Sequence, residues 1–222
     1  MNTIEAWSYS RYRAYKDCPA AFKYAHVDKR PAGPGSPAMQ RGEQIHLLAE
    51  KYAKKLMPKT VPAPLARFEK QFLEVRALNP IVENGWGFRR DWSFIDRPDW
   101  FGPDVWFRMK ADLMINYRDD TADLIDHKTG KMYGTNEEQV ELFALSGFKR
   151  FPHIKHITTR LWYLDSGEEI ISEYSARQVP AIQKKWEQKI KPMFADRRFA
   201  PLPSWRCGSC AFSKAHGGPC KF

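Results

Sequence analysis

Residues 105–129, VWFRMKADLMINYRDDTADLIDHKT, contain the pattern that decides the fold. Apolar residues alternate along the first half of this stretch: Val105, Phe107, Met109, Ala111, Leu113, Ile115 and Tyr117. A period of two is typical of a β-strand. Asp119 and Asp120 suit a turn, and residues 121–129 form a second candidate strand, so the stretch predicts a β-hairpin.

Helical periodicity appears both before and after this hairpin. One helix is predicted over residues 39–56 from a single apolar stripe: Ile45, Leu48, Ala49, Tyr52 and Leu56. Other helices are predicted over residues 10–16 (capped by Ser10), 64–75, 137–151 and 176–195. Other strands are predicted over residues 86–95, 156–164 and 169–175. This order predicts an α/β fold with a mixed central β-sheet flanked by helices.

The length of 222 residues fits one domain over residues 1–222. Within it we expect a mainly helical part (1–80), a sheet core (81–175) and a C-terminal helix with a cysteine tail (176–222). The start, MNTIEAWSYSRYR, lacks the apolar segment of a signal peptide, and no apolar run has the length of a membrane span. The sequence therefore predicts a cytoplasmic protein.

The charge is basic overall and unevenly distributed. The formal net charge is +10, and residues 1–60 hold 11 Lys/Arg against 5 Asp/Glu. Residues 176–222 hold 10 against 2, whereas residues 61–175 hold 15 against 19. The basic excess at the two ends favours a polyanionic partner there, and the acidic excess of the middle favours bound cations. Ordinary solvated surface would give the same counts.

Two acids and a lysine fall together on the predicted hairpin. Asp126 and Lys128 are two positions apart and share one face of their strand, while His127 points the other way. If the strands pair, Asp112 comes within reach of the same metal ion as Asp126. Carboxylates suit Mg²⁺ or Mn²⁺, and a nearby lysine can stabilise a pentavalent phosphate, or position water and help to deprotonate it. Taken alone, the pattern is more typical of a charged surface hairpin.

Two further side chains fit such a site. His46 lies between Glu43 and Glu50 on one face of the predicted helix, and an imidazole would favour Mn²⁺ over Mg²⁺. A half-buried structural histidine is the alternative. Gln139, on a helical face with Phe143, can orient water or phosphate or simply be exposed.

Four cysteines form a candidate second metal site. Cys207 and Cys210 make a C-x2-C pair, and Cys220 follows ten positions later. A fourth ligand would be Cys18 or His216. In a reducing compartment this spacing indicates metal binding more than disulfides.

Several short motifs together resemble the RecB-type nucleases of the PD-(D/E)XK superfamily. They are SYSRYRAYKDCPAAFKY (8–24), GEQIHLLAE (42–50), KADLM (110–114), LIDHKTGK (124–131), EEQVELFAL (137–145) and the terminal cysteines. Their order matches the iron–sulfur branch, which includes the CRISPR-associated RecB-like exonucleases and the AddB nuclease domain. The resemblance covers almost the whole chain.

The resemblance implies a role for each matching residue. His46, Asp112 and Asp126 would bind Mg²⁺ or Mn²⁺ together with the backbone carbonyl of His127, Lys128 would be the catalytic lysine, and Gln139 would be the helical glutamine. Cys18, Cys207, Cys210 and Cys220 would bind a [4Fe–4S] cluster that joins the N- and C-terminal segments. Phe143 departs from the tyrosine of many members. The long gap before Cys220 leaves zinc as an alternative to the cluster.

The implied activity is divalent-metal-dependent cleavage of DNA, as an exonuclease on single-stranded ends in a bacterial, archaeal or phage-infected cell. Trp86, Trp92, Trp100 and Trp106 are candidates for base stacking, with the core as the alternative. A non-catalytic DNA-binding subunit of a recombination or repair complex and an RNA-processing nuclease are competing hypotheses. Recombination or CRISPR adaptation proteins are expected partners, and an oligomer is compatible with the family.

Overall fold

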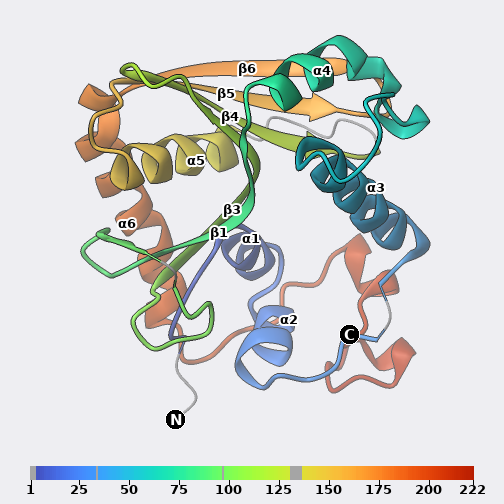
Figure 1. The fold of residues 1–222 in the computed structure, drawn as a ribbon. Coiled ribbons are helices and arrows are strands. Elements are labelled where there is room, and N and C mark those ends of the chain that lie inside the picture. Colours follow the sequence, from blue (N-terminus) through green and yellow to red (C-terminus); the bar gives the residue numbers. More distant parts are fainter. Residues whose placement is uncertain (1–3, 34, 97, 131–136) are drawn as a thin grey trace. The chain divides into compact units, whose positions relative to one another are not determined.

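The computed structural model describes residues 4–33, 35–96, 98–130 and 137–222. The chain forms two compact units (Figure 1). The larger unit comprises residues 36–183, and the smaller unit comprises residues 1–35 and 184–222. The prediction of one domain over residues 1–222 stays a prediction.

The described part of the larger unit contains a six-stranded mixed sheet in the order β2-β1-β3-β4-β5-β6. Its strands are β1 (Ile81–Phe88), β2 (Phe94–Ile95), β3 (Phe107–Asn116), β4 (Thr121–Lys128), β5 (His156–Tyr163) and β6 (Glu168–Ser175). Only the β4–β5 pair is parallel among them, and the other neighbours are antiparallel. The predicted α/β fold with a mixed sheet is therefore confirmed.

The hairpin forms where the sequence predicts it. β3 and β4 pair with Leu113 opposite Ile125 and Met114 opposite Leu124. In the turn, one carboxylate oxygen of Asp119 accepts hydrogen bonds from the backbone N–H and the hydroxyl of Thr121, at 2.6 and 2.7 Å. A short side chain that bonds the backbone two residues ahead is a common way to fix such a turn.

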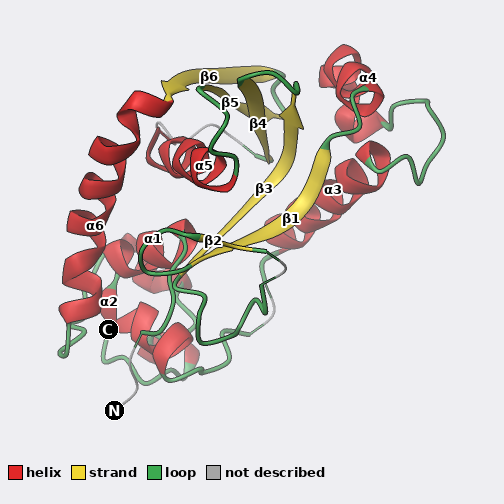
Figure 2. Cartoon of the chain, turned by 60° about the vertical axis from the view of Figure 1, so that its left-hand side comes forward, coloured by secondary structure: helices red, strands yellow, loops and turns green. Residues whose placement is uncertain are grey.

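Helices cover both faces of this sheet (Figure 2). On one face, α3 (Pro37–Ala53), the 3₁₀ helix η2 (Ala63–Phe68) and α4 (Glu69–Ala77) build a core with alternate sheet residues. That core includes Leu113, Ile125 and Trp162 of three adjacent strands. On the other face lies α5 (Glu137–Arg150). The side chains of successive β4 residues therefore point alternately to the α3–α4 layer and to the α5 layer.

Gly147 lets α5 approach the sheet closely. A Cβ at this position would lie 2.6 Å from Cδ1 of Ile157 and 3.1 Å from Cδ1 of Leu124. A larger residue would have to move the helix away from β4 and β5. The contact also shows that Leu124 points toward α5, so Asp126 and Lys128, at alternate positions, do the same.

Some predicted boundaries were wrong. Helix α1 spans Tyr9–Asp17, and Ser8, not Ser10, caps it by accepting a hydrogen bond from the N–H of Arg11 at 3.3 Å. The segment 86–95 is not one strand, because it turns between β1 and β2, where Trp92 has a φ of 66°. The predicted helix over 64–75 begins as the 3₁₀ turn η2.

The smaller unit is mainly helical. It contains α1, α2 (Pro19–Phe22), the π-turn η1 (Lys23–Val27), most of α6 (Val179–Ala195), and the 3₁₀ turns η4 (Trp205–Ser209) and η5 (Lys214–His216). Another 3₁₀ turn, η3 (Ala176–Gln178), belongs to the larger unit. The ring of Trp186 packs in the core of the smaller unit, and its centroid lies 5.8 Å from that of Trp7 and 5.3 Å from that of Tyr12.

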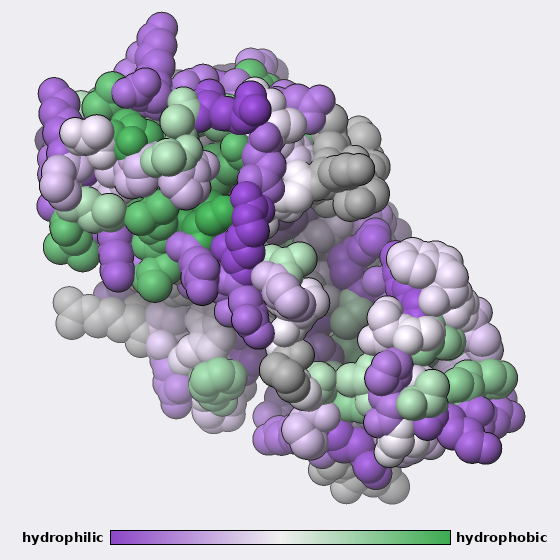
Figure 3. Space-filling model, turned by 90° about the vertical axis from the view of Figure 1, so that its right-hand side faces the viewer, coloured by the Kyte–Doolittle hydropathy of each residue, from purple (hydrophilic) through white to green (hydrophobic). Residues whose placement is uncertain are grey.

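Hydrophobic side chains gather in patches bordered by hydrophilic ones on the face drawn in Figure 3. Trp205, Phe101 and Leu56 are 84%, 77% and 71% exposed. None of the helices in the described ranges is long and apolar enough to cross a membrane.

Candidate active site

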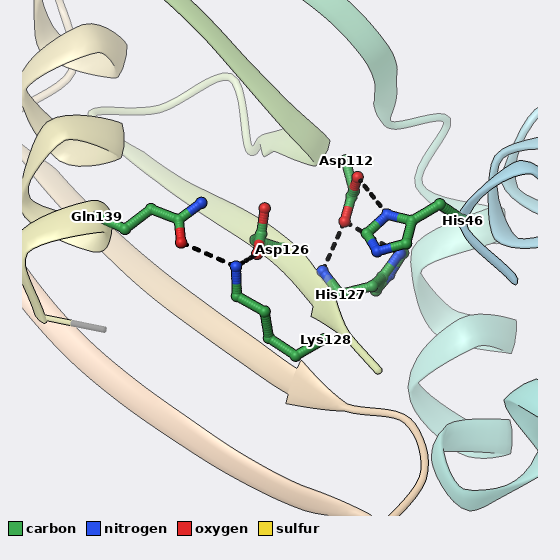
Figure 4. Close-up of polar contacts among 6 residues, drawn as sticks. All are labelled: His46, Asp112, Asp126, His127, Lys128 and Gln139. Carbon is green, nitrogen blue, oxygen red and sulfur yellow. Dashed lines mark hydrogen bonds and ion pairs between the residues drawn. The ribbon is translucent and has the colours of Figure 1, made fainter. Parts of the chain in front are cut away.

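One half of the candidate site lies between β4 and α5. Nζ of Lys128 lies 2.7 Å from Oδ2 of Asp126 and donates a hydrogen bond to Oε1 of Gln139 at 2.8 Å (Figure 4). Alternation along β4 places the acid and the lysine on the same face, and the first turn of α5 supplies the glutamine. These contacts hold the lysine between two oxygen acceptors.

The other half is built around Asp112. One carboxylate oxygen, Oδ1, lies 3.0 Å from Nδ1 of His46 on α3, and Oδ2 accepts the backbone N–H of His127 at 2.6 Å. The register between β3 and β4 ends at the pair Leu113–Ile125, and one further step would place Asp112 opposite Asp126. Beyond that pair, the carboxylate of Asp112 accepts the backbone N–H of His127 on β4, in the way that a backbone carbonyl of a neighbouring strand would.

His127 has a different environment from Asp126 and Lys128. Its ring lies in the core on the α3–α4 face, with centroids 5.2 Å from Phe72 and 5.7 Å from Trp162. It is 1% exposed, and neither ring nitrogen makes a hydrogen bond in the structure described here. Nδ1 lies 3.4 Å from Oδ2 of Asp112.

The residues present fit a divalent metal ion. One ligand atom each from His46, Asp112 and His127 lie within 4.8 Å of one another. Oδ2 of Asp126 is buried, pairs with the ammonium of Lys128 at 2.7 Å and lies outside this group. Two imidazoles and a carboxylate, with both ring nitrogens of the buried His127 lacking a hydrogen bond, are a donor set suited to Mn²⁺, Mg²⁺ or related ions.

Burial and neighbouring charges set the protonation states. Burial works to raise the pKa of Asp112, but the imidazoles of His127 and His46 outweigh it and hold the pKa at about 2. Burial raises the pKa of Asp126 to about 6, against the opposing effect of Lys128. Burial also lowers the pKa of His127 to about 4. At neutral pH both acids are ionised and His127 is neutral.

Lys128 stays protonated. Burial alone would lower the pKa of its amine, but the carboxylate of Asp126 more than compensates, and the pKa is raised above its usual value. The side chain is 24% exposed, so the ammonium is partly open to solvent. In the metal-free chain, an amine in this state is a hydrogen-bond donor and a positive charge.

A surface clamp holds the end of β4 against α3. Asp165, in the turn between β5 and β6, accepts hydrogen bonds from both terminal nitrogens of Arg41, at 2.5 and 2.9 Å, and from the N–H of Gly130 at 2.6 Å. Next to it, a Cβ on Gly42 of α3 would lie 3.0 Å from the hydroxyl oxygen of Thr129. The clamp therefore joins the helix that carries His46 to the segment directly after Lys128.

An open groove lies beside the site. It measures about 800 Å³, and its lining includes His46 and Asp112 together with Glu43, Glu50 and Lys110. The predicted neighbours of His46 thus border the groove, while the group suited to a metal ion does not include them.

All four cysteines line one cavity in the smaller unit. The cavity measures about 460 Å³, and its walls include Cys18, Cys207, Cys210 and Cys220. Backbone N–H groups of Leu202 and Ser204 point at the sulfurs of Cys18 and Cys207, at 3.5 and 3.4 Å. The expected fourth cysteine, far away in the sequence, is therefore in the same cavity as the other three.

A protein-family model for the PD-(D/E)XK nuclease superfamily matches residues 6–215. The chain belongs to this superfamily. No curated protein matches it. Among solved structures, a protein from Eubacterium rectale described as a "Putative exonuclease" is similar at 10% identity and a TM-score of 0.52, over 85% of this chain and 80% of that chain. SSO0001 aligns at 15% identity and a TM-score of 0.41, over 100% and 88% of the two chains.

Membership of the PD-(D/E)XK nuclease superfamily implies a metal-dependent hydrolase with a sheet-based fold. The structure brings His46 of α3 and Asp112 of β3 together, and separately Asp126 and Lys128 of β4 with Gln139 of α5. His127 was expected to contribute only its carbonyl, whereas the structure places its ring in the group suited to a metal. The ligand roles themselves remain predictions.

Sequence reasoning about this nuclease missed Arg41 and Asp165. Asp165 falls between the strands predicted over residues 156–164 and 169–175 and had no predicted role, because its partners lie 35 and 124 residues away. A usable signal existed in principle. β4 and β5 are parallel neighbours with Lys128 opposite Tyr163, so residues directly after β5 must lie near the end of β4 that carries Lys128.

Proposed function

We propose that this PD-(D/E)XK nuclease hydrolyses DNA with Mn²⁺ or Mg²⁺, acting as an exonuclease on single-stranded ends. One observation carries the proposal: the Asp112–His46 pair and the Asp126–Lys128–Gln139 group meet at the end of one β-hairpin. This is the combination of acids, histidine and lysine that metal-assisted phosphodiester hydrolysis needs.

Asp112, Asp126 and His46 would hold the metal ion, with His127 as a further donor through its carbonyl or its ring. When bound, the ion would neutralise phosphate charge and lower the pKa of water. The chain itself prepares these ligands. The N–H of His127 and the imidazole of His46 keep the carboxylate of Asp112 ionised and fixed in direction.

Lys128 would act as an ammonium and not as a general base. Asp126 and Gln139 aim its Nζ, and its raised pKa keeps it charged at neutral pH. A fixed positive charge stabilises the extra negative charge that develops on a phosphoryl group during hydrolysis. Gln139 would be a positioning residue that acts through this lysine.

Two features support an exonuclease that acts on a nucleic acid, and single-stranded DNA is the substrate that we propose. The net charge of +10 favours a polyanion, and the similar fold from Eubacterium rectale belongs to a protein described as a "Putative exonuclease". A non-catalytic DNA-binding subunit is the weaker hypothesis, because such a role would not require Asp112, Asp126 and Lys128 to be preserved together in one geometry.

We also propose that the cysteines bind an iron–sulfur cluster. Ligands of one tetrahedral zinc ion, with bonds of about 2.3 Å, lie roughly 3.8 Å apart. In the described chain, no three cysteine sulfurs form a group within 4.8 Å of one another. The four sulfurs nevertheless line one cavity. This wider spacing favours a polynuclear cluster over a single zinc ion.

A cleavage assay tests the nuclease. The protein would be incubated with single strands labelled at the 5′ or the 3′ end, in Mn²⁺, Mg²⁺ or EDTA. We expect metal-dependent shortening from one end, and loss of at least 1,000-fold in rate for Lys128→Met. Glu173→Gln, at an exposed position of β6, is the matched control and should cleave normally. Equal cleavage by Lys128→Met and the unaltered protein would refute the assignment.

A further inference from the structure

The excess positive charge of the chain lies entirely in the smaller unit. Residues 1–35 and 184–222 hold 15 Lys/Arg against 5 Asp/Glu, whereas residues 36–183 hold 21 of each. The unit that contains the candidate active site is therefore formally neutral. The net charge of +10 belongs to the unit that contains the cysteines.

The same unit presents aromatic rings around its cysteine-lined cavity. Tyr24, Trp205 and Phe222 all contribute to the cavity wall. Trp205 is 84% exposed and Phe222 is 44% exposed. By contrast, Trp86 and Trp92, which the sequence offered as stacking candidates, are each 1% exposed and lie in the core of the larger unit. A tryptophan exposed to this degree contributes little to the core and leaves its ring open to a ligand.

Each of these three rings has a cation close to it. The guanidinium of Arg206 lies 5.3 Å from the ring centre of Trp205 and also pairs with Asp17 at 2.6 Å. Nζ of Lys221 lies 5.1 Å from the centre of Phe222, and the guanidinium of Arg30 lies 5.7 Å from that of Tyr24. Rings that alternate with cations are the composition of surfaces that bind single-stranded nucleic acid.

We propose that Trp205 is a base-stacking residue of a second, non-catalytic binding site for single-stranded DNA, with Phe222 beside the same cavity and Arg206 and Lys221 as phosphate contacts. A single strand is favoured over a duplex, because only unpaired bases expose their faces to a tryptophan ring. The choice of DNA rests on the proposed function, but binding is measured without cleavage.

Fluorescence anisotropy tests the site directly. The full-length protein, with its cysteine-bound group intact, would be titrated into fluorescein-labelled dT20 in EDTA. We expect Trp205→Ala to weaken binding about 5- to 100-fold, the range for loss of one base–aromatic stack. Trp205→Phe should stay within about threefold. On an abasic strand of equal length, Trp205→Ala should bind like the unaltered protein.

Salt dependence separates stacking from charge. Arg206→Ala and Lys221→Ala should each reduce the slope of log Kd against log salt concentration by about 0.7, the value for one phosphate contact on a single strand. Trp205→Ala should leave the slope unchanged. Because Trp205 is exposed, thermal unfolding and visible absorbance of its variants should match those of the unaltered protein.

Phe101→Ala is the matched control. Phe101 is 77% exposed and has the guanidinium of Arg108 5.2 Å from its ring, but it belongs to the neutral unit. Unaltered dT20 binding by Trp205→Ala, equal losses on the abasic strand, or an equal loss in Phe101→Ala would each overturn the proposal. Binding through Trp205 without metal-dependent cleavage would refute only the nuclease.

Discussion

Asp123 and Asp126 lie three residues apart on β4, and both are buried, yet they have different surroundings. Asp123 accepts a hydrogen bond from Nε of Arg160 at 2.7 Å. Arg160 also donates to Glu169, which accepts the indole N–H of Trp162 at 2.9 Å. Asp126, on the opposite face, has its Oδ2 paired with the ammonium of Lys128 at 2.7 Å and feels the nearby carboxylate of Asp112.

The difference shows that burial alone does not mark a functional acid. Around Asp123, donors and acceptors within the chain complete the network, so the acid serves the fold. Beside Asp112, both ring nitrogens of the buried His127 lack a hydrogen bond within the described chain. Such unsatisfied buried groups are rare in native proteins, and a metal ion held by His46 and Asp112 would supply a partner for one of them.

Neutralising each acid in turn gives the largest contrast. We expect Asp126→Asn to reduce metal-dependent cleavage at least 1,000-fold, because the site loses a proposed metal ligand and the partner of Lys128. Asp123→Asn should retain activity within about threefold. Cleavage rates of the two variants on the same labelled strand, at saturating Mn²⁺, measure the difference. Similar losses in both would remove the distinction between the two acids.

The expected effect of Asp123→Asn is on the stability of the fold. Removing one partner of a buried ion pair typically destabilises a protein by roughly 3–5 kcal/mol. For Asp123→Asn we expect a loss of about 2 kcal/mol in the free energy of unfolding, because Arg160 is 29% exposed and keeps Glu169. Urea unfolding of the metal-free proteins gives this value. A fully stable Asp123→Asn would mean that its ion pair is structurally unimportant.

The pH dependence of the metal-free protein distinguishes Asp126 in another way. Its pKa is about 6 in the folded chain against 3.8 ordinarily, so the folded state holds more protons between these values. Unfolding free energy should therefore fall as pH rises from about 4 to 6, by about 1–2 kcal/mol relative to Asp126→Asn.

His127 acts in the other direction in this window. Its pKa is lowered to about 4, so its contribution to stability rises with pH up to its ordinary value of 6.5. The comparison with Asp126→Asn isolates the carboxyl, since both proteins keep His127. Parallel stability curves for the two proteins across pH 4–7 would contradict a raised pKa at Asp126.

A third acid, Asp165, tests whether a partly exposed side chain positions the residues of the site. Asp165 is 31% exposed and fixes Gly130 and Arg41 next to the site. We expect Asp165→Asn to lower kcat about five- to tenfold with little change in KM or stability, since exposed ion pairs contribute roughly 0–1 kcal/mol. Asp165→Glu should recover part of the rate. Unchanged kcat in Asp165→Asn would leave the clamp without a catalytic role.

The sequence by itself determined the β3–β4 hairpin, the main helices and the family. Strict alternation over residues 105–117 has one structural solution, because side chains on a strand point to opposite faces. The pairing of Asp126 with Lys128 followed from the same period. Helical periodicity also identified the element that carries His46, and the approximate start of α5 with Gln139.

Only the tertiary structure decided how these pieces meet. The ring of His127 lies beside Asp112 because α3 and α4 cover one face of the sheet, a packing that no local pattern contains. Asp165 and Cys18 reach their partners across 35 and more than 180 residues. Likewise, the sequence contains eight tryptophans, and no local pattern in it distinguishes the buried Trp86 from the exposed Trp205. Period and charge are local properties of a chain, whereas burial and the completion of a polar network depend on residues that only folding brings together.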